Sequence, residues 1–124
     1  MTITYTTDLA RVRALVRDEA SAAGLPTARV ADLVLAVSEV AANTVRHARS
    51  AGTLTITREL GEIVCEVRDA GVITDPLAGR RTPPQGALNG HGLWLVFQVC
   101  DQVELLSGAD GTMVRMHMQV SNHD

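Results

Sequence analysis

The sequence has no excess of basic residues, no long apolar run and no cluster of cysteines. Its formal net charge is -3 and its pI is about 5.7, so it offers no surplus positive charge to a nucleic-acid backbone or an anionic membrane. No apolar run approaches the roughly 18 residues of a membrane-spanning helix, and the N-terminus lacks the ordered regions of a secretion signal. These absences predict a cytoplasmic protein that contacts neither nucleic acid nor membrane directly.

The two cysteines do not suggest a disulfide framework. Cys65 lies in a strand-like run and Cys100 in a helix-like run, where a thiol usually behaves as a small buried apolar group. Both are predicted to be reduced core residues, as is usual in the cytoplasm. A chain of 124 residues, 46% of them hydrophobic, can bury one core, and we expect a single domain over residues 1–124.

Three segments have the apolar periodicity of helices. The first covers residues 9–23, after the helix-starting residue Asp8, and stops before Gly24-Leu25-Pro26. The second begins with Thr27 as its N-cap and keeps one broad apolar face as far as Ala48, a face that includes Thr44. The third covers residues 93–99. The length of the second segment predicts that it is the core helix.

Runs of alternating or β-branched residues predict strands over 2–6, 53–60, 63–68, 103–106 and 113–120. Gly61-Glu62 is predicted to connect the second and third of these as a hairpin, and residues 108–111 to turn between the last two. The strands are grouped as hairpins and do not alternate strictly with helices. The predicted fold class is therefore α+β, a two-layer α/β sandwich with helices on one face of a mostly antiparallel sheet.

Polar residues of the second helix form one stripe. Glu39, Asn43 and His47 are spaced four apart, so each lies about 40° from the last and away from the apolar face. An amide oxygen at Asn43 suits the hard ion Mg²⁺, and a carboxylate at Glu39 can deprotonate a water or hydroxyl nucleophile. On the helix alone, however, a solvated polar face is the favoured interpretation.

Two glycine-bearing segments border a stretch that is too long for an ordinary connector. Gly90-His91-Gly92-Leu93 opens a helix, where backbone amides can approach a phosphate. Asp69-Ala70-Gly71 ends a strand, where a carboxylate can accept a hydrogen bond from adenine N6 and a glycine admits a flat base. Either segment alone also fits ordinary turn residues. Residues 70–89, between them, are predicted to form a functional lid.

Together, the three segments resemble a known superfamily. Glu39-x-x-x-Asn43 on a helix, Asp69-x-Gly71 after a strand and Gly90-x-Gly92-Leu93 entering a helix are similar to the N, G1 and G2 boxes of the gyrase, heat-shock chaperone, histidine-kinase and MutL (GHKL) ATPases. The resemblance implies the Bergerat-type ATP-binding fold, with ATP and Mg²⁺ as ligands. One departure is that Val72-Ile73 follows Gly71, where relatives often have a further glycine.

Within that superfamily, residues 36–43, the short chain and Gly111-Thr112 most resemble the stand-alone bacterial anti-sigma factors that are also serine/threonine protein kinases. The resemblance gives roles to particular positions. The residue matching Glu39 would be the general base and the one matching Asn43 the Mg²⁺ ligand. Asp69 would recognise adenine, the G2 glycines would border the phosphates, and Thr112 would support the adenine end.

The same resemblance implies an anti-sigma regulatory factor with kinase activity, whose partners are a sigma factor and an anti-anti-sigma (STAS-type) protein, often in a homodimer. Two alternatives stay open. One is a nucleotide-responsive module that binds a regulator without phosphotransfer, because residues that hold ATP and residues that transfer its phosphoryl group overlap. The weaker one is a histidine-kinase-type catalytic domain acting in trans. His91 fits a phosphate contact or a solvent-facing position equally, and His47 is interpreted as a helix-surface residue.

Overall fold

The computed structural model describes residues 1–48, 51–71 and 91–120, with the backbone alone for His47, Ala48 and His91. In chain order the elements are β1 (Thr2–Tyr5), α1 (Leu9–Ala23), α2 (Thr27–Asn43), a π-helical turn η1 (Thr44–Ala48), β2 (Gly52–Glu59), β3 (Glu62–Asp69), α3 (His91–Val99), β4 (Gln102–Gly108) and β5 (Gly111–Gln119). No helix in this part of the chain is both long and apolar enough to cross a membrane.

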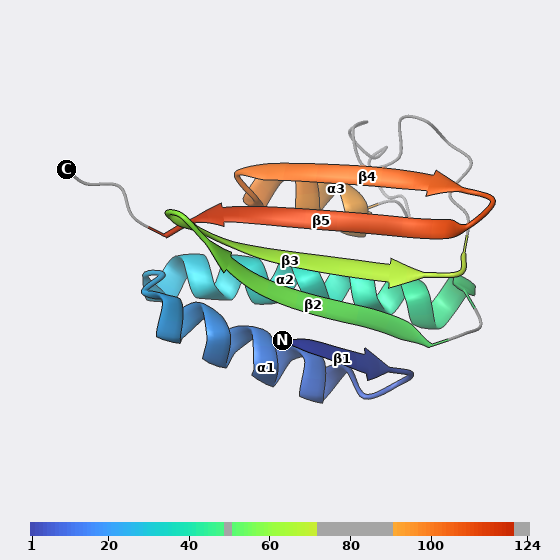
Figure 1. Cartoon of the computed structure of the whole chain (residues 1–124), viewed down its shortest axis with the longest axis horizontal. Helices are drawn as coiled ribbons and strands as arrows, with labels where there is room; N and C mark the ends of the chain where they lie inside the picture. The colour runs from blue at the N-terminus through green and yellow to red at the C-terminus, as the bar shows by residue number, and fades with distance from the viewer. Residues whose placement is uncertain (49–50, 72–90, 121–124) are drawn as a thin grey trace.

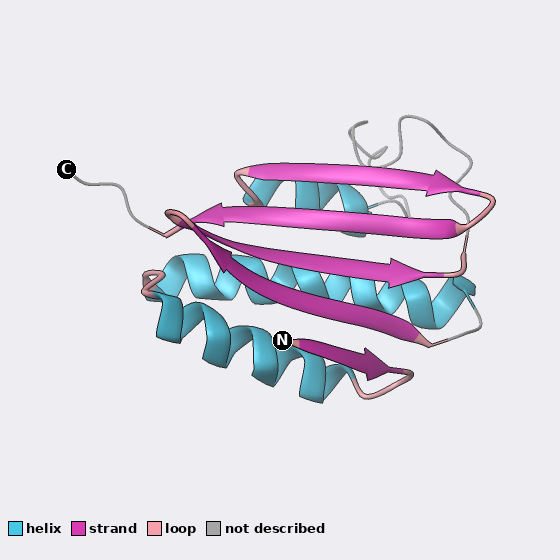
Figure 2. Cartoon of the chain, viewed as in Figure 1, coloured by secondary structure: helices cyan, strands magenta, loops and turns pink. Residues whose placement is uncertain are grey.

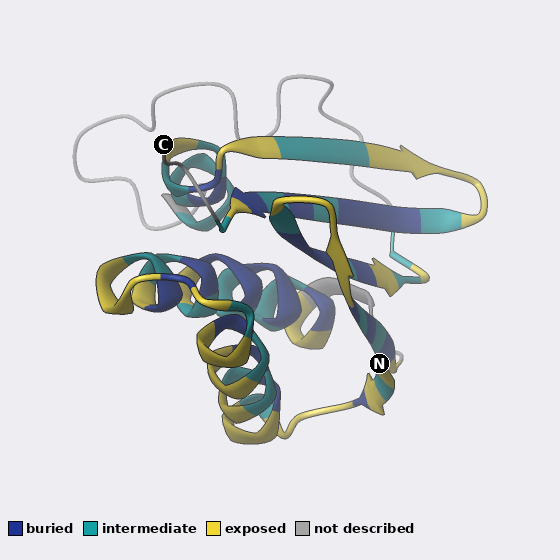
Figure 3. Cartoon of the chain, turned by 60° about the vertical axis from the view of Figure 1, so that its left-hand side comes forward, coloured by how far each residue is buried: buried dark blue, intermediate teal, exposed yellow. Residues whose placement is uncertain are grey.

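The strands make one five-stranded sheet in the order β1-β2-β3-β5-β4, and every pairing is antiparallel. Helices α1, α2 and α3 lie together on one face of this sheet (Figures 1 and 2). The other face carries no helix among the described elements, as the side view in Figure 3 shows. The predicted α+β two-layer sandwich is therefore confirmed.

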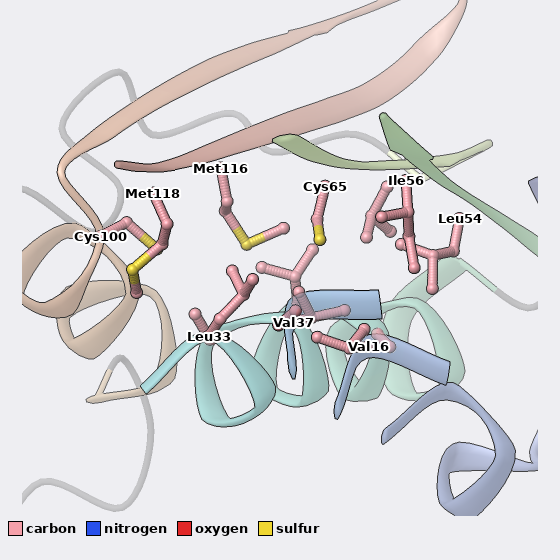
Figure 4. Close-up of a cluster of buried hydrophobic side chains, with 14 of the residues drawn as sticks. Val16, Leu33, Val37, Leu54, Ile56, Cys65, Cys100, Met116 and Met118 are labelled. Atoms are coloured by element: carbon pink, nitrogen blue, oxygen red, sulfur yellow. The ribbon is translucent and has the colours of Figure 1, made fainter. Parts of the chain in front are cut away.

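The core lies between α2 and the middle of the sheet. Leu33 and Val37 of α2 point toward Cys65 of β3 and toward Met116 and Met118 of β5 (Figure 4), and all five side chains are fully buried. Each such side chain stabilises the fold by about 1.5–3 kcal/mol when it leaves water. The alternation of apolar residues along β3 and β5 thus fixes which face of the sheet receives the helices.

Both cysteines are buried, free thiols within this core, as predicted. Burial raises the pKa of Cys65 and of Cys100 to about 12. A thiol with so high a pKa holds its proton at neutral pH, and the thiolate is the reactive form. The two residues therefore act as packing groups.

The ends of α1 follow the sequence signals closely. The side chain of Asp8 accepts a hydrogen bond from the backbone N–H of Arg11 at 3.0 Å, which caps the first turn. Gly24 adopts the left-handed conformation at φ 100°, and its N–H group bonds to the carbonyl of Ala20. Leu25 also donates to Ala20 and is buried, so the helix ends in a glycine cap with an apolar contact after it.

The helix predicted to run to Ala48 is α-helical only as far as Asn43 and π-helical from Thr44 to Ala48. A predicted cap and a predicted turn are also wrong. The residue that caps α2 is Pro26, which offers no side-chain hydrogen bond, whereas Thr27 is already the first helical residue. The hairpin between β2 and β3 turns at Leu60-Gly61, because Glu59 pairs with Glu62, and Gly61 has a positive φ of 72°. Both the cap of α2 and the first residue of the hairpin turn therefore lie one position earlier than predicted.

The helix-free face of the sheet carries a ladder of ion pairs across β3, β5 and β4. Arg115 donates to Glu66 at 2.7 Å, and Arg68 donates to the same carboxylate at 2.6 Å. His117 lies between Glu62, 2.9 Å from Nδ1, and Glu104, 2.6 Å from Nε2. Burial alone would lower the pKa of His117, but the two carboxylates raise it above the ordinary value.

This pair of contacts makes the fold stability depend on pH. Since the folded pKa of His117 is raised, its stabilisation is fully present below the unfolded pKa of about 6.5 and is lost as the pH rises through the folded value. We predict that His117→Gln lowers the free energy of unfolding more at pH 6 than at pH 9, as measured by urea unfolding. In a Glu62→Gln/Glu104→Gln background the same substitution should no longer cost more at pH 6 than at pH 9, because only burial, which lowers the pKa of His117, then acts on it. An equal loss at both pH values in the wild-type background would contradict the prediction.

Candidate nucleotide site

The end of α2, the end of β3 and the start of β5 meet at one edge of the molecule (Figure 1). The register of the sheet pairs Asp69, the last residue of β3, with Thr112 near the start of β5. The chain leaves α2 at Asn43 and enters the π-helical turn η1, where the first residue, Thr44, reaches Asp69. A π-turn within a helix is frequently found at a functional site.

The Asp69-Ala70-Gly71 segment forms a tight turn held from both ends. The Oδ1 atom of Asp69 accepts a hydrogen bond from the N–H of Gly71 at 2.8 Å, as in an Asx turn. The hydroxyl of Thr112 donates to the carbonyl of Gly71 at 2.7 Å. Because that proton is committed, Ser107 of β4 must donate in the 2.7 Å contact between the Ser107 and Thr112 hydroxyls. Thus three of the predicted site residues lie together: Asp69 and Gly71 form the turn, and Thr112 binds it from β5.

A second chain of hydrogen bonds reaches the same carboxylate from the opposite side. Thr44 donates to Oδ2 of Asp69 at 2.7 Å, and the hydroxyl of Tyr5 donates to Thr44 at 2.9 Å. Thr44 is 0% and Tyr5 3% exposed. Neither residue was among the predicted site residues. For Thr44 a signal existed, since a hydroxyl on the apolar face of a helix requires a buried partner.

Gly111 lies directly behind the turn. Its φ of 113° is in the left-handed region, and a β-carbon there would collide with the backbone carbonyl of Asp69. A side chain at this position would therefore push β5 away from the end of β3. Only glycine allows Thr112, the next residue, to approach Gly71.

Helix α3 brings a further predicted residue against α2. A β-carbon added to Gly92 would lie 3.4 Å from Oε1 of Glu39, so the glutamate side chain rests on the first turn of α3. Leu93 is partly buried and packs against the core. His91 begins α3, but its side chain lies outside the described residues, as do the side chain of His47, the whole of Gly90 and lid residues 72–89.

Asn43 is partly buried, and its Oδ1 atom accepts a hydrogen bond from Arg46 at 2.6 Å. An amide oxygen suits Mg²⁺, which takes few protein ligands and completes its shell with water and substrate phosphates. The donor set fits such an ion, although Arg46 would have to release or share the oxygen. Among the described residues no group of at least three His, Cys, Asp or Glu side chains could hold a metal ion.

The family model of the histidine kinase-like ATPase domain matches residues 4–118 of the chain. The chain therefore belongs to this family of GHKL-type ATPase domains. A comparison with curated protein sequences gives no match.

Solved structures share the fold at low sequence identity. One contains the RsbU and RsbW domains of Rv1364c from Mycobacterium tuberculosis, with 19% identity and a TM-score of 0.66 over 96% of this chain and 32% of that one. Another is the histidine kinase domain of the blue-light activated histidine kinase of Erythrobacter litoralis EL346, with 20% identity and a TM-score of 0.62 over 90% and 59%. The chain therefore spans less than two-thirds of either structure.

Alanine substitutions at three glycines of the sheet test whether Gly111 is required beside the Asp69–Gly71 turn. Gly111→Ala introduces both an unfavourable φ and a backbone collision, so we predict a loss of unfolding free energy of roughly 2 kcal/mol or more. Gly61→Ala, with a positive φ but open space, should cost about 1–2 kcal/mol. Gly108→Ala, which pairs with Gly111 and meets no neighbouring atom, should change stability by about 0.5 kcal/mol or less. Chemical denaturation measures the three values, and a Gly111→Ala loss no larger than that of Gly61→Ala would contradict the collision.

Proposed function

We propose that this chain binds ATP with Mg²⁺ and transfers the γ-phosphoryl group to a serine or threonine hydroxyl of a partner protein, as an anti-sigma regulatory kinase. The observation that carries the proposal is that Thr44, at the end of α2, and Thr112 both bind the Asp69–Gly71 turn, while Glu39 of the same helix contacts Gly92 of α3. Membership of the histidine kinase-like ATPase family supports the use of ATP. The resemblance of residues 36–43 and 111–112 to anti-sigma kinases supports the choice of acceptor.

The adenine end of the nucleotide would lie at Asp69. Each carboxylate oxygen has two lone pairs, and the protein uses one on each oxygen, through Gly71 and Thr44. The remaining lone pairs can accept a hydrogen bond from the adenine 6-amino group. A 6-oxo purine offers no donor at that position, so the site should prefer adenine to guanine.

The phosphate end would lie between α2 and α3. The backbone N–H groups of the first turn of α3, around Gly92 and Leu93, have no intrahelical acceptor and can face the phosphates. Asn43 would hold Mg²⁺, which when bound neutralises the phosphate oxygens. Gly92 permits close approach, because Glu39 already occupies the space beside it.

In the transfer step, Glu39 accepts the proton of the partner's serine or threonine hydroxyl. The hydroxyl oxygen then forms a bond to the γ-phosphorus, while the bond from the γ-phosphorus to the oxygen bridging the β and γ phosphates breaks. The products are ADP, the phosphorylated partner and a protonated Glu39. The proposed partners are an anti-anti-sigma (STAS-type) protein as phosphate acceptor and a sigma factor as the sequestered regulator, with a homodimer as the assembly.

One observation favours a second candidate, a nucleotide-responsive module without phosphotransfer. The oxygen of Asn43 that would hold Mg²⁺ is engaged by Arg46 at 2.6 Å. If that bond persisted with nucleotide, the adenine end could still bind while the γ-phosphate lacked a metal. The same incubation that tests transfer separates the two candidates.

Nucleotide binding is tested by thermal unfolding. ATP with Mg²⁺ at about 100 times its dissociation constant should stabilise the protein by roughly 2.7 kcal/mol. Asp69→Asn should remove most of this gain, because the amide presents a donor where the adenine amine needs an acceptor. Glu104→Gln, on the helix-free face, serves as the matched control and should keep it. No ATP-dependent shift in the wild type would rule out the proposal.

Transfer is tested with labelled ATP and a candidate anti-anti-sigma protein. We predict that Glu39→Gln keeps ATP affinity within about threefold and lowers the transfer rate by roughly 10²- to 10⁴-fold, since the amide cannot accept the proton. Unchanged transfer in this variant would remove Glu39 from the chemistry. ATP binding by the wild type without labelling of any partner would favour the binding module.

A further inference from the structure

We propose that Tyr5 and Thr44 are positioning residues that set the adenine selectivity of Asp69, through a buried relay of hydroxyl groups from the edge strand β1. The inference rests on the proposed function, because it concerns how the carboxylate assigned to adenine is held. It adds two residues to that site, one of them from a strand far from the nucleotide-binding segments in the sequence.

The direction of the relay follows from proton counting. The Thr44 hydroxyl donates in the 2.7 Å bond to Oδ2 of Asp69. The Thr44 hydroxyl has a single proton, so Tyr5 must donate in the 2.9 Å bond to Thr44. Burial raises the pKa of Tyr5 above its ordinary value, and the phenol therefore keeps its proton at any physiological pH. Each hydroxyl of the relay therefore donates in one fixed direction, from Tyr5 to Thr44 and from Thr44 to Asp69.

The relay controls the rotation of a hydroxyl. A threonine hydroxyl can turn its proton in several directions, and in a buried site the lone pair engaged by Tyr5 leaves the proton aimed at Asp69. With Oδ2 held in this way and Oδ1 held by Gly71 at 2.8 Å, the plane of the carboxylate is fixed. In a fixed plane, the remaining lone pairs of Asp69 point at one position. The carboxylate can then bind the adenine 6-amino group selectively.

The edge strand is built to bring Tyr5 to this position. The register pairs Tyr5 with Gly52, and a β-carbon on Gly52 would collide with the ring and hydroxyl of Tyr5. The missing side chain at the start of β2 thus gives the ring a place to lie across the sheet and reach Thr44. Tyr5, Gly52 and Thr44 form one constellation, which makes β1 part of the nucleotide site.

The test compares dissociation constants for ATP and for purine riboside triphosphate, which is ATP without the 6-amino group. A hydrogen bond to a charged acceptor is worth about tenfold or more in affinity, and wild type should prefer ATP by that factor. Tyr5→Phe removes the hydroxyl that orients Thr44. The ratio of the two dissociation constants should therefore fall by about threefold. Thr44→Val should lower this ratio further. Thr44→Ser, which keeps a hydroxyl at this position, should give a ratio close to the wild-type value.

The ratio of the two constants separates positioning from general stability. A variant that is merely less folded weakens both nucleotides equally and leaves the ratio unchanged. Thr2→Val is the matched control, since it removes a β1 hydroxyl that contacts Thr55 of β2 at 3.1 Å and has no part in the relay; its ratio should equal that of wild type. If Thr44→Val does not fold, Tyr5→Phe alone decides the question.

The outcomes differ for the two proposals. A wild type that prefers ATP, with the ratio unchanged in Tyr5→Phe, would overturn the relay and leave the proposed function intact. Equal loss of preference in Thr44→Ser and Thr44→Val would also overturn it, because the hydroxyl would not be the operative group. A wild type that binds neither nucleotide would overturn the proposed function, and the relay with it.

Discussion

The antiparallel pairing of β3 with β5 determines where every other part of the site lies. It brings Asp69, at the end of one strand, opposite Thr112, at the start of the other. It also lines up Cys65 with Met116 and Ile63 with Met118, which form the surface on which α2 rests. A slip of one residue would turn these apolar groups to the open face and separate the turn at Gly71 from its threonine.

The site depends on a small number of polar groups in an otherwise apolar setting. Within the described residues, every buried side-chain nitrogen and oxygen has a hydrogen-bond partner. Removing one member of such a network leaves another unsatisfied, which costs more than the bond itself contributes. The hydroxyl relay and the Gly71 turn therefore make the shape of the site specific, in addition to stabilising it.

Membership of the histidine kinase-like ATPase family gives the fold and implies ATP binding, but the same site is compatible with different acceptors. Two further residues of this chain contact the proposed ligand-binding groups. Arg46 bonds the amide oxygen proposed for Mg²⁺, and Thr44 bonds the carboxylate proposed for adenine. Thr44 and Arg46 both lie in the π-helical turn η1. This short segment therefore contacts the proposed adenine end and the proposed Mg²⁺ end of the nucleotide site.

The sequence alone determined the elements whose signals are local. The periodicity of residues 9–23, the cap at Asp8 and the glycine stop at Gly24 predicted α1 correctly, because these signals act over a single turn. The alternation along residues 113–120 likewise predicted β5 and the face that it buries. The order of the glycine and Asn motifs was sufficient to indicate the superfamily.

Only the tertiary structure decided which side chains act together. The sequence places Tyr5, Thr44 and Asp69 far apart, and neither periodicity nor motif spacing contains the register that joins them. It equally gave no sign that Gly52 makes room for a tyrosine ring or that Gly111 faces the carbonyl of Asp69. Such contacts arise from packing between elements, where the position of each side chain depends on all its neighbours at once, so no local pattern encodes them.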